Sequence, residues 1–256
     1  MKRKANAIRR FIYRALPLNT YLTLLSKFYF LSFDLGLLKN NKLYEYPYFL
    51  KHVIHKGDVV IDIGANLGYL STLFSKLVGD TGKVYAVEPV KPVLEILKKN
   101  TRKCKNIEIL PYALGEEDKS IQLVNDTIQK NGFMASGAHK IMTEKAEADI
   151  SFDAEMRRGS KLFENLEKLD FIKCDIEGYE VVVLRELEPI IQKFRPMLLV
   201  EARRANRIEL IKFFKEREYT NLSLEKDILV PATPGGYFDM LIIPNEKLNR
   251  VSQFIK

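Results

Sequence analysis

The chain has 256 residues, of which 46% are hydrophobic, enough for one large α/β domain with a core of its own. Its formal net charge of +8 comes from the N-terminal part, because residues 1–56 carry eleven Lys or Arg and two Asp or Glu, whereas the other 200 residues carry 30 and 31. A nearly neutral body argues against nucleic acid as a partner. The two cysteines and three histidines stand at no familiar zinc-ligand spacing, so we expect no zinc site and two reduced thiols.

Residues 1–50 are predicted to form a basic helical extension. In residues 1–16, apolar residues recur at helical spacing and arginines lie mostly on the other side. Such a helix either lies on an anionic membrane surface or packs its apolar face on the domain. Polar residues interrupt the apolar stretch 15–38, and no cleavage-site pattern follows it, so neither a transmembrane span nor a signal peptide is expected. We therefore expect a cytoplasmic protein whose membrane contact, if any, is peripheral and made through residues 1–16.

Residues 51–250 are predicted to form a doubly wound α/β domain, because apolar runs alternate with helical patterns. VVIDIG at 59–64 is β-branched and continuous, as in a parallel strand covered on both faces. The other expected strands are 83–89, 107–115, 121–124, 171–178 and 197–202, with a hairpin-like pair within 222–244. The expected helices are 68–78, 90–103, 179–194 and 206–218. This order predicts a Rossmann-like, mostly parallel sheet that binds its ligand at the carboxyl ends of the strands.

Residues 125–168 interrupt this alternation. The segment is polar and has few apolar periods, and a loop of this length inside a compact domain is usually functional. We expect an insertion loop that acts as a lid, with one short helix around Ser160 to Leu166. A disordered segment is the alternative.

The first strand runs directly into a glycine-spaced turn, DIGANLG at 62–68, and the second strand ends in Glu88. An acid at that position accepts hydrogen bonds from ribose hydroxyls, so the turn holds either a dinucleotide or S-adenosylmethionine. A dinucleotide needs glycine two and five residues after Gly64, so that pyrophosphate can approach the backbone. This chain has Asn66 and Tyr69 at those positions, which argues against a dinucleotide.

The aspartate at the strand end favours S-adenosylmethionine. The carboxylate of Asp62 can form a charge-assisted hydrogen bond with the ammonium group of the methionine end, whereas it would repel a pyrophosphate. No GK[ST] pattern of a phosphate-binding loop follows the turn. The sequence therefore predicts S-adenosyl-L-methionine as the cofactor, and a tight turn without a ligand is the structural alternative.

Five blocks carry a family resemblance through their order and spacing. They are GDVVIDIGANLGYLS (57–71), VYAVEP (84–89), YALG (112–115), LDFIKCDIEGYE (169–180) and LLVEA (198–202). Together they resemble the FkbM family of S-adenosylmethionine-dependent methyltransferases, over about residues 43–244. The resemblance implies O-methylation, often of a sugar or natural-product hydroxyl. The charged middle segment, with SGAH at 136–139, matches the family's serine/glycine stretch only loosely, and the arginine-rich N-terminus lies outside the family pattern.

The resemblance also assigns residues to the cofactor. The residues implied at the methionine-side turn are Asp62, Gly64, Ala65, Asn66 and Gly68. Glu88 corresponds to the acid that binds the ribose, and Ala113 and Leu114 to the segment near the adenine. Glu45 belongs to a short Tyr-Glu motif upstream of the turn.

Acids gather just after the fourth main strand, in KCDIEGYE at 173–180. Methyl transfer to a hydroxyl requires an aligned acceptor and a group that accepts its proton. Asp175 is the first candidate for this role and His139 the second, although a lone histidine in a loop is more often only solvated. The structural alternative for the acids is a capped turn before the following helix. Asp175, Glu177 and Glu201 could in principle hold Mg²⁺, but this signal is weak and we predict no metal site.

Other functions fit the sequence less well. N-methyltransferases of bases typically carry an Asn/Asp-Pro-Pro-Tyr/Phe turn where this chain has DIEG. RNA methylation would call for a basic groove, which the neutral body does not suggest. A non-catalytic module on the same fold, which binds a nucleoside or a protein partner, is the main alternative from another class. The acceptor expected from the main interpretation is a small-molecule or glycan hydroxyl.

Overall fold

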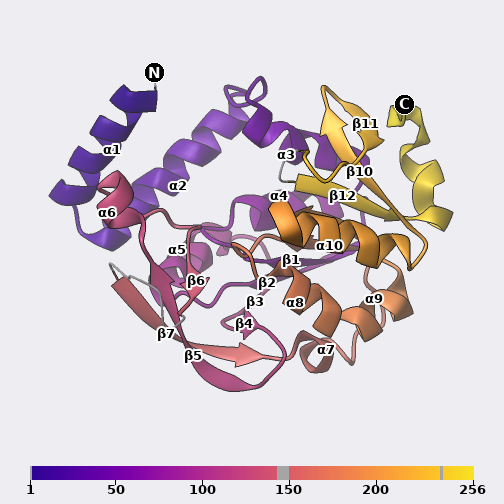
Figure 1. The fold of residues 1–256 in the computed structure, drawn as a ribbon. Coiled ribbons are helices and arrows are strands. Elements are labelled where there is room, and N and C mark those ends of the chain that lie inside the picture. Colours follow the sequence, from indigo (N-terminus) through magenta and orange to yellow (C-terminus); the bar gives the residue numbers. More distant parts are fainter. Residues whose placement is uncertain (1, 143–149, 237–238) are drawn as a thin grey trace.

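The computed structural model describes residues 2–142, 150–236 and 239–256. Within these residues, eight strands form a central sheet in the order β11-β10-β12-β9-β8-β1-β2-β3 (Figure 1). The strands are β1 (Val59–Ile63), β2 (Lys83–Val87), β3 (Ile107–Leu110), β8 (Phe171–Cys174), β9 (Met197–Glu201), β10 (Tyr219–Glu225), β11 (Ile228–Pro231) and β12 (Asp239–Pro244). The five strands from β3 to β9 are parallel, and β12 runs antiparallel between β9 and β10.

Helices flank the central sheet. The α-helices are α1 (Lys2–Ala15), α2 (Leu18–Asp34), α3 (Glu45–Phe49), α4 (Tyr69–Val78), α5 (Lys91–Thr101), α6 (Thr127–Asn131), α7 (Gly159–Leu162), α8 (Glu180–Glu186), α9 (Glu188–Phe194) and α10 (Arg204–Lys215). Three 3-10 segments are η1 (Lys42–Tyr44), η2 (Leu50–His52) and η3 (Asn245–Phe254). The predicted helix 179–194 is two helices, because Pro189 at the start of α9 cannot continue the hydrogen bonding of α8.

Both faces of the sheet are buried, as the continuous apolar strands predict. In β1, Ile61 and Ile63 face the cluster that α8, α9 and α10 form, whereas Val60 faces the cluster with Phe74 and Val78 of α4. Two hydrophobic cores therefore cover the sheet, one on each side. The predicted doubly wound, Rossmann-like class is confirmed, and the C-terminal hairpin consists of three strands instead of two.

The N-terminal extension folds back on the domain. Tyr21 and Leu22 of α2 are buried against Val93 and Ile96 of α5. The chain turns between α1 and α2 at Pro17, which precedes α2 and cannot continue α1. Figure 1 shows the two helices along one side of the molecule.

The segment predicted as an insertion loop contains ordered strands, which corrects that prediction. A second sheet has the order β4-β7-β5-β6, formed by β4 (Ala113–Leu114), β5 (Lys119–Asn125), β6 (Lys140–Ile141) and β7 (Ile150–Arg157). The predicted strand 107–115 is thereby split between the two sheets. The predicted short helix corresponds in part to α7, whereas residues 143–149 of the segment lie outside the described residues.

Candidate active site

The turn after β1 brings two strand ends together. Gly64 has φ of +77°, and a Cβ at this position would overlap the carbonyl oxygen of Asp175 beyond β8. The amides of Gly64 and Ala65 donate to the carbonyl oxygen of Val87, at 3.0 and 2.9 Å, which fixes the turn against the end of β2. Asn66 follows with φ of +52°. Glycine at position 64 is therefore a packing requirement, since any side chain would separate β1 from β8.

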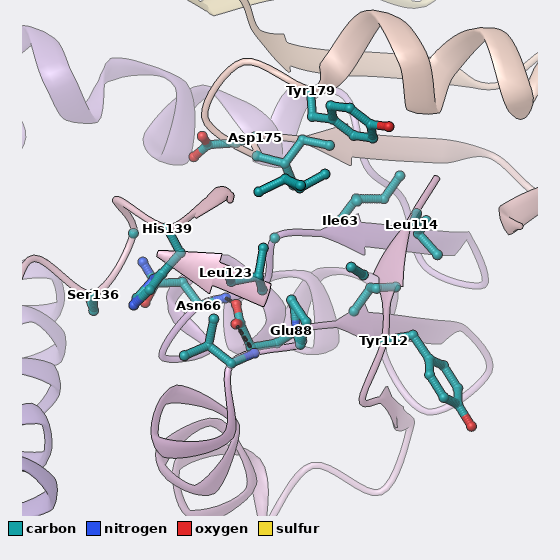
Figure 2. A pocket seen from close by; sticks show the side chains of 18 residues that line it. Ile63, Asn66, Glu88, Tyr112, Leu114, Leu123, Ser136, His139, Asp175 and Tyr179 are labelled. Atoms are coloured by element: carbon teal, nitrogen blue, oxygen red, sulfur yellow. Dashed lines mark hydrogen bonds between the residues drawn. The ribbon is translucent and has the colours of Figure 1, made fainter. Parts of the chain in front are cut away.

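A pocket opens at the carboxyl ends of β1 and β2, next to this turn (Figure 2). It contains about 690 Å³ of space that no atom fills, open solvent at its mouth included. The structure brings seven predicted site residues to its wall: Gly64, Asn66, Glu88, Ala113, Leu114, His139 and Asp175. Residues that the sequence did not single out also line it, among them Tyr112, Ser136 and Tyr179.

Glu88 is buried at the floor of this pocket, with its carboxylate held by the backbone. Its two oxygens accept hydrogen bonds from the amides of Asn66 and Val90, both at 2.9 Å. Burial raises the pKa of Glu88 to about 7, although the two amide donors act in the opposite direction. The carboxylate is thus fixed in place and retains lone pairs for further donors such as hydroxyls.

Four predicted cofactor residues do not line the pocket. Ala65 packs in the cluster with Ala86, and Gly68, with φ of +86°, precedes α4 at a distance from Leu97 that leaves no room for a Cβ. Glu45 begins α3 and lines neither this pocket nor a second pocket beside it, which is described below. Asp62 is fully buried beneath the strand ends. The glycine spacing therefore serves chain packing at several of these positions.

Asp62 meets a buried lysine that the sequence did not single out for a role. In the parallel register, Asp62 of β1 lies beside Lys173 of β8, and the Nζ atom of Lys173 is 3.5 Å from Oδ1 of Asp62. The same Nζ donates to the carbonyl oxygens of Ile63 and Gly64 and lies 3.8 Å from Asp175. Burial lowers the pKa of Lys173, but the carboxylates of Asp175 and Asp62 outweigh this effect and hold it above its ordinary value. Lys173 thus stays charged and joins the turn to the acidic end of β8.

The second sheet supplies the other wall of the pocket. A Cβ on Gly137 would lie 2.9 Å from Nδ2 of Asn66, so the 136–139 stretch packs directly on the turn. In Figure 2, Asn66 and His139 lie toward one end of the view, and Leu114 and Tyr112 toward the other. Burial lowers the pKa of His139 to about 4, so its ring is neutral at pH 7. The part of the chain predicted to be a lid therefore forms a wall of the pocket.

A second pocket adjoins the first, and Asp175 lines both of them. Three acids with Lys173 form its polar side: Asp175, Glu201 and Asp239. Burial, reinforced by the charge of Asp175, raises the pKa of Glu201 and of Asp239 to about 7. Leu43, Tyr46, Pro47, Leu70 and Leu199 contribute apolar surface. The sequence did not identify Asp239, whose only signal is an acid at the first position of an apolar strand.

Some of the acids also make structural hydrogen bonds, as the alternative of a capped turn predicts. Glu201 accepts a hydrogen bond from Nε of Arg203 at 3.0 Å. Oε1 of Glu180 accepts hydrogen bonds from the amides of Ile176 and Gly178, which caps the turn before α8. Among the residues that the structure describes, no three His, Cys, Asp or Glu side chains are grouped as metal ligands.

A mostly parallel sheet with two reversed strands, β12 and β11, and a pocket between a glycine turn and the acid that follows β2 define a Rossmann-like domain of the class I methyltransferase type. A model of the FkbM methyltransferase domain matches residues 62–220. The chain therefore belongs to the FkbM methyltransferase domain family, as the sequence blocks predict.

Individual relatives match shorter parts of the chain. A protein-L-isoaspartate O-methyltransferase of Methanosarcina mazei is 42% identical over 57 residues, which are 22% of this chain and 24% of that protein. A probable cobalt-precorrin-6B C(15)-methyltransferase of Saccharolobus solfataricus is 28% identical over 88 residues, 34% of this chain and 44% of the relative. The chain thus spans less than half the length of these curated relatives. The crystal structure of methyltransferase FkbM from Methylobacillus flagellatus KT is 16% identical to this chain and superposes with a TM-score of 0.50. The match spans 77% of this chain and 50% of the FkbM chain, and it supports the fold.

The family assignment confirms the predicted cofactor, S-adenosyl-L-methionine. The pocket fits this molecule, because two buried polar atoms at its wall, Oδ1 of Asn66 and Nε2 of His139, have no hydrogen-bond partner among the described residues. Beneath the turn, Oδ1 of Asp62 also accepts no hydrogen bond, but it does not line the pocket and the charged Nζ of Lys173 lies 3.5 Å from it. Buried acceptors of this kind are costly unless a donor reaches them, and the cofactor carries an ammonium group and ribose hydroxyls. Glu88, Asn66 and the segment at Ala113 would hold its nucleoside part.

Proposed function

We propose that the protein is an O-methyltransferase that transfers a methyl group from S-adenosylmethionine to a hydroxyl of a sugar, glycan or natural-product-like acceptor. The observation that carries this proposal is the pair of adjoining pockets with Asp175 in the wall of both. The first pocket is assigned to the cofactor and the second to the acceptor. The near-neutral charge of residues 57–256 supports a small acceptor over a nucleic acid.

The second pocket offers the chemistry that a hydroxyl acceptor needs. When bound, the cofactor supplies the methyl group as an electrophile. Asp175, Glu201 and Asp239 present carboxylate oxygens that can accept hydrogen bonds from the acceptor's hydroxyls, and one of them takes the proton as the oxygen attacks. We assign this step to Asp175, because it alone among the three also lines the cofactor pocket.

Two neighbouring carboxylates exchange protons near neutral pH. Burial raises the pKa values of Glu201 and Asp239 to about 7, so the second pocket can accept and release protons in that range. His139 lines the cofactor pocket and is not part of the second one. We therefore assign His139 to cofactor contact through its neutral ring and not to proton transfer.

Some further assignments are part of the same proposal. Residues 51–250 would be the catalytic domain and residues 1–50 an extension that closes one side of it. The 125–168 segment would shape the cofactor pocket from the second sheet. We place the enzyme in the cytoplasm. No helix among the described residues has both the length and the hydropathy needed to cross a membrane.

The test is a screen of glycan and small-molecule hydroxyls with cofactor labelled at the methyl group, followed by turnover of Asp175→Asn on the best acceptor. We expect the variant to lose about 100-fold in kcat while it still binds the cofactor. Asp80→Asn is the matched control and should keep full turnover. Asp80 is exposed in the turn before β2, at the amino ends of the strands, whereas the pockets lie at their carboxyl ends.

Two results would contradict the proposal. Full turnover of Asp175→Asn would show that this carboxylate is not the base. Cofactor binding without transfer to any hydroxyl in the screen, or transfer to nitrogen acceptors only, would favour the alternative module without catalysis or a different acceptor class.

A further inference from the structure

One side of α2 is apolar and exposed. The exposed fractions are 45% for Leu24, 71% for Phe28, 59% for Leu31 and 64% for Leu35, which directly follows the helix. Their spacing of four, three and four residues places them in one line along the helix. The opposite side carries the buried Leu22 and Ser26, so this line faces away from the domain.

Two further exposed leucines follow α2 in the chain. Leu37 and Leu43, in the segment before α3, are 70% and 73% exposed. Eight of the twelve large hydrophobic side chains that the described residues expose lie within residues 8–43. Exposed apolar residues are normally scattered singly, whereas a concentration of this kind marks an interaction surface. We call the following residues the apolar face: Leu24, Phe28, Leu31, Leu35, Leu37 and Leu43.

Positive charge accompanies the apolar face. Lys27, Lys39 and Lys42 are exposed within the same stretch, and the one acid of α2, Asp34, lies 3.9 Å from Lys76 of α4. The body of the protein beyond residue 56 is nearly neutral, so these charges are not part of a generally basic surface. An exposed apolar line with a lysine beside it on the helix and two more in the following segment is typical of a surface that lies in the interface of an anionic membrane.

We propose that the apolar face docks the protein peripherally on a membrane that contains anionic lipids. The leucines and Phe28 enter the boundary between headgroups and acyl chains, and Lys27, Lys39 and Lys42 contact phosphate groups. The charge of the three lysines favours a membrane over a second copy of the chain as the partner of the apolar face. Two copies joined through this face would bring their lysines together, whereas an anionic surface neutralises them.

The docking face differs from the one expected from the sequence. In α1, Nε of Arg9 donates to the hydroxyl of Tyr21 at 2.8 Å, and Nε of Arg10 donates to the carbonyl oxygen of Asn131 at 2.6 Å. These arginines attach α1 to the domain. Ile8 and Phe11 of the same helix are exposed and give α1 an apolar surface of its own.

The apolar face reaches the second pocket, because Leu43 belongs to the face and also lines the pocket. Docking would therefore bring the mouth of that pocket close to the membrane surface. An acceptor hydroxyl carried by a lipid could then enter from the bilayer. Only this last consequence rests on the proposed function.

The test is cosedimentation of the full chain with vesicles of phosphatidylcholine, with and without phosphatidylglycerol. We expect binding to the anionic vesicles that weakens as salt is added. Replacing three lysines, as Lys27→Gln, Lys39→Gln and Lys42→Gln together, should weaken binding on the order of 100-fold. The pair Phe28→Gln and Leu31→Gln should weaken it at least about tenfold. Ile208→Gln on α10, where the side chain is 55% exposed outside the face, is the matched control and should bind as the unchanged protein does.

Cofactor binding by each variant shows that the variant is folded. The vesicle experiment needs no turnover, so its result is independent of the proposed function. Failure of the unchanged protein to bind anionic vesicles would overturn the proposal. So would equal binding by the Phe28 and Leu31 variant and its control. A dimer of the unchanged protein that the same two substitutions turn into a monomer, without vesicle binding, would assign the face to a second copy instead.

Discussion

At the level of single residues, Gly64 has two independent reasons to be glycine. Its φ of +77° is strained for other residues, and a Cβ would overlap the backbone at Asp175. Gly36 has a similar φ of +70°, but no atom of the described structure lies within 4 Å of a Cβ built on it. A substitution at Gly36 therefore measures the backbone strain without the steric overlap. Gly235 meets neither condition.

We predict that Gly64→Ala lowers the free energy of unfolding by at least about 2 kcal/mol, because the strands β1 and β8 must separate. Gly36→Ala should cost about 1 kcal/mol and Gly235→Ala about zero. Urea denaturation of the three variants measures these values. A loss at Gly64 no larger than that at Gly36 would mean that the close approach of the two strands does not require glycine.

Glu88 links cofactor binding to pH. Burial raises its pKa from 4.5 to about 7, so the stability that its neutral form contributes at low pH is lost as the pH rises through about 7. Ribose hydroxyls donate hydrogen bonds, so cofactor binding favours the ionised form. We predict that cofactor affinity falls as the pH is lowered below about 7, by up to about tenfold per pH unit.

Calorimetric titration between about pH 6 and pH 8 tests this dependence, since the window brackets the pKa. Glu88→Gln should bind more weakly at pH 8 and lose the dependence on pH. Glu201 and Asp239 also titrate near 7, so persistence of the full dependence in Glu88→Gln would assign it to those two acids.

At the level of elements, α1 contacts the segment from α6 to His139, which connects β5 and β6 of the second sheet. The guanidinium of Arg9 bonds to Tyr21 and lies 4.2 Å from the centre of the Phe133 ring, just after α6. The segment from α6 to His139 in turn packs on the cofactor turn through Gly137. The N-terminal extension therefore supports one wall of the cofactor pocket.

We predict that Arg9→Ala lowers the free energy of unfolding by about 1–2 kcal/mol and speeds amide hydrogen exchange in residues 127–134. Arg14→Ala in the same helix should change neither, because Arg14 is exposed. Hydrogen exchange followed by mass spectrometry reports both. Equal protection of residues 127–134 in Arg9→Ala and Arg14→Ala would contradict the support that we assign to Arg9.

The second sheet is also the element that sequence reasoning described least well. Residues 150–157, ISFDAEMR, alternate apolar and polar side chains as a strand with one covered face does, and in β7 the polar positions are the more exposed. The alternation was present in the sequence, but the charge of the surrounding segment concealed it. The strands of the central sheet gave a stronger signal because both of their faces are buried.

At the level of the whole molecule, local signals predicted the parallel sheet, the glycine turn and Glu88. Contacts between distant segments could not be predicted in the same way. Lys173 meets Asp62 only because β8 pairs with β1 in one particular register. Asp239 reaches the second pocket because β12 inserts between β9 and β10. Pocket residues that depend on strand order were therefore missed. Local motifs predicted Gly64, Asn66 and Glu88, which line the pocket, but also Asp62, Ala65 and Gly68, which do not.

The central claim is that the pocket beside Gly64 and Glu88 binds S-adenosylmethionine. Calorimetric titration of the purified full chain with S-adenosylmethionine, S-adenosylhomocysteine and NAD in parallel tests it most directly. The structure and the family predict saturable one-to-one binding of the first two ligands, weakened by Glu88→Gln, and no binding of NAD. Binding of NAD, or no binding of S-adenosylmethionine and S-adenosylhomocysteine by the folded protein, would contradict the claim.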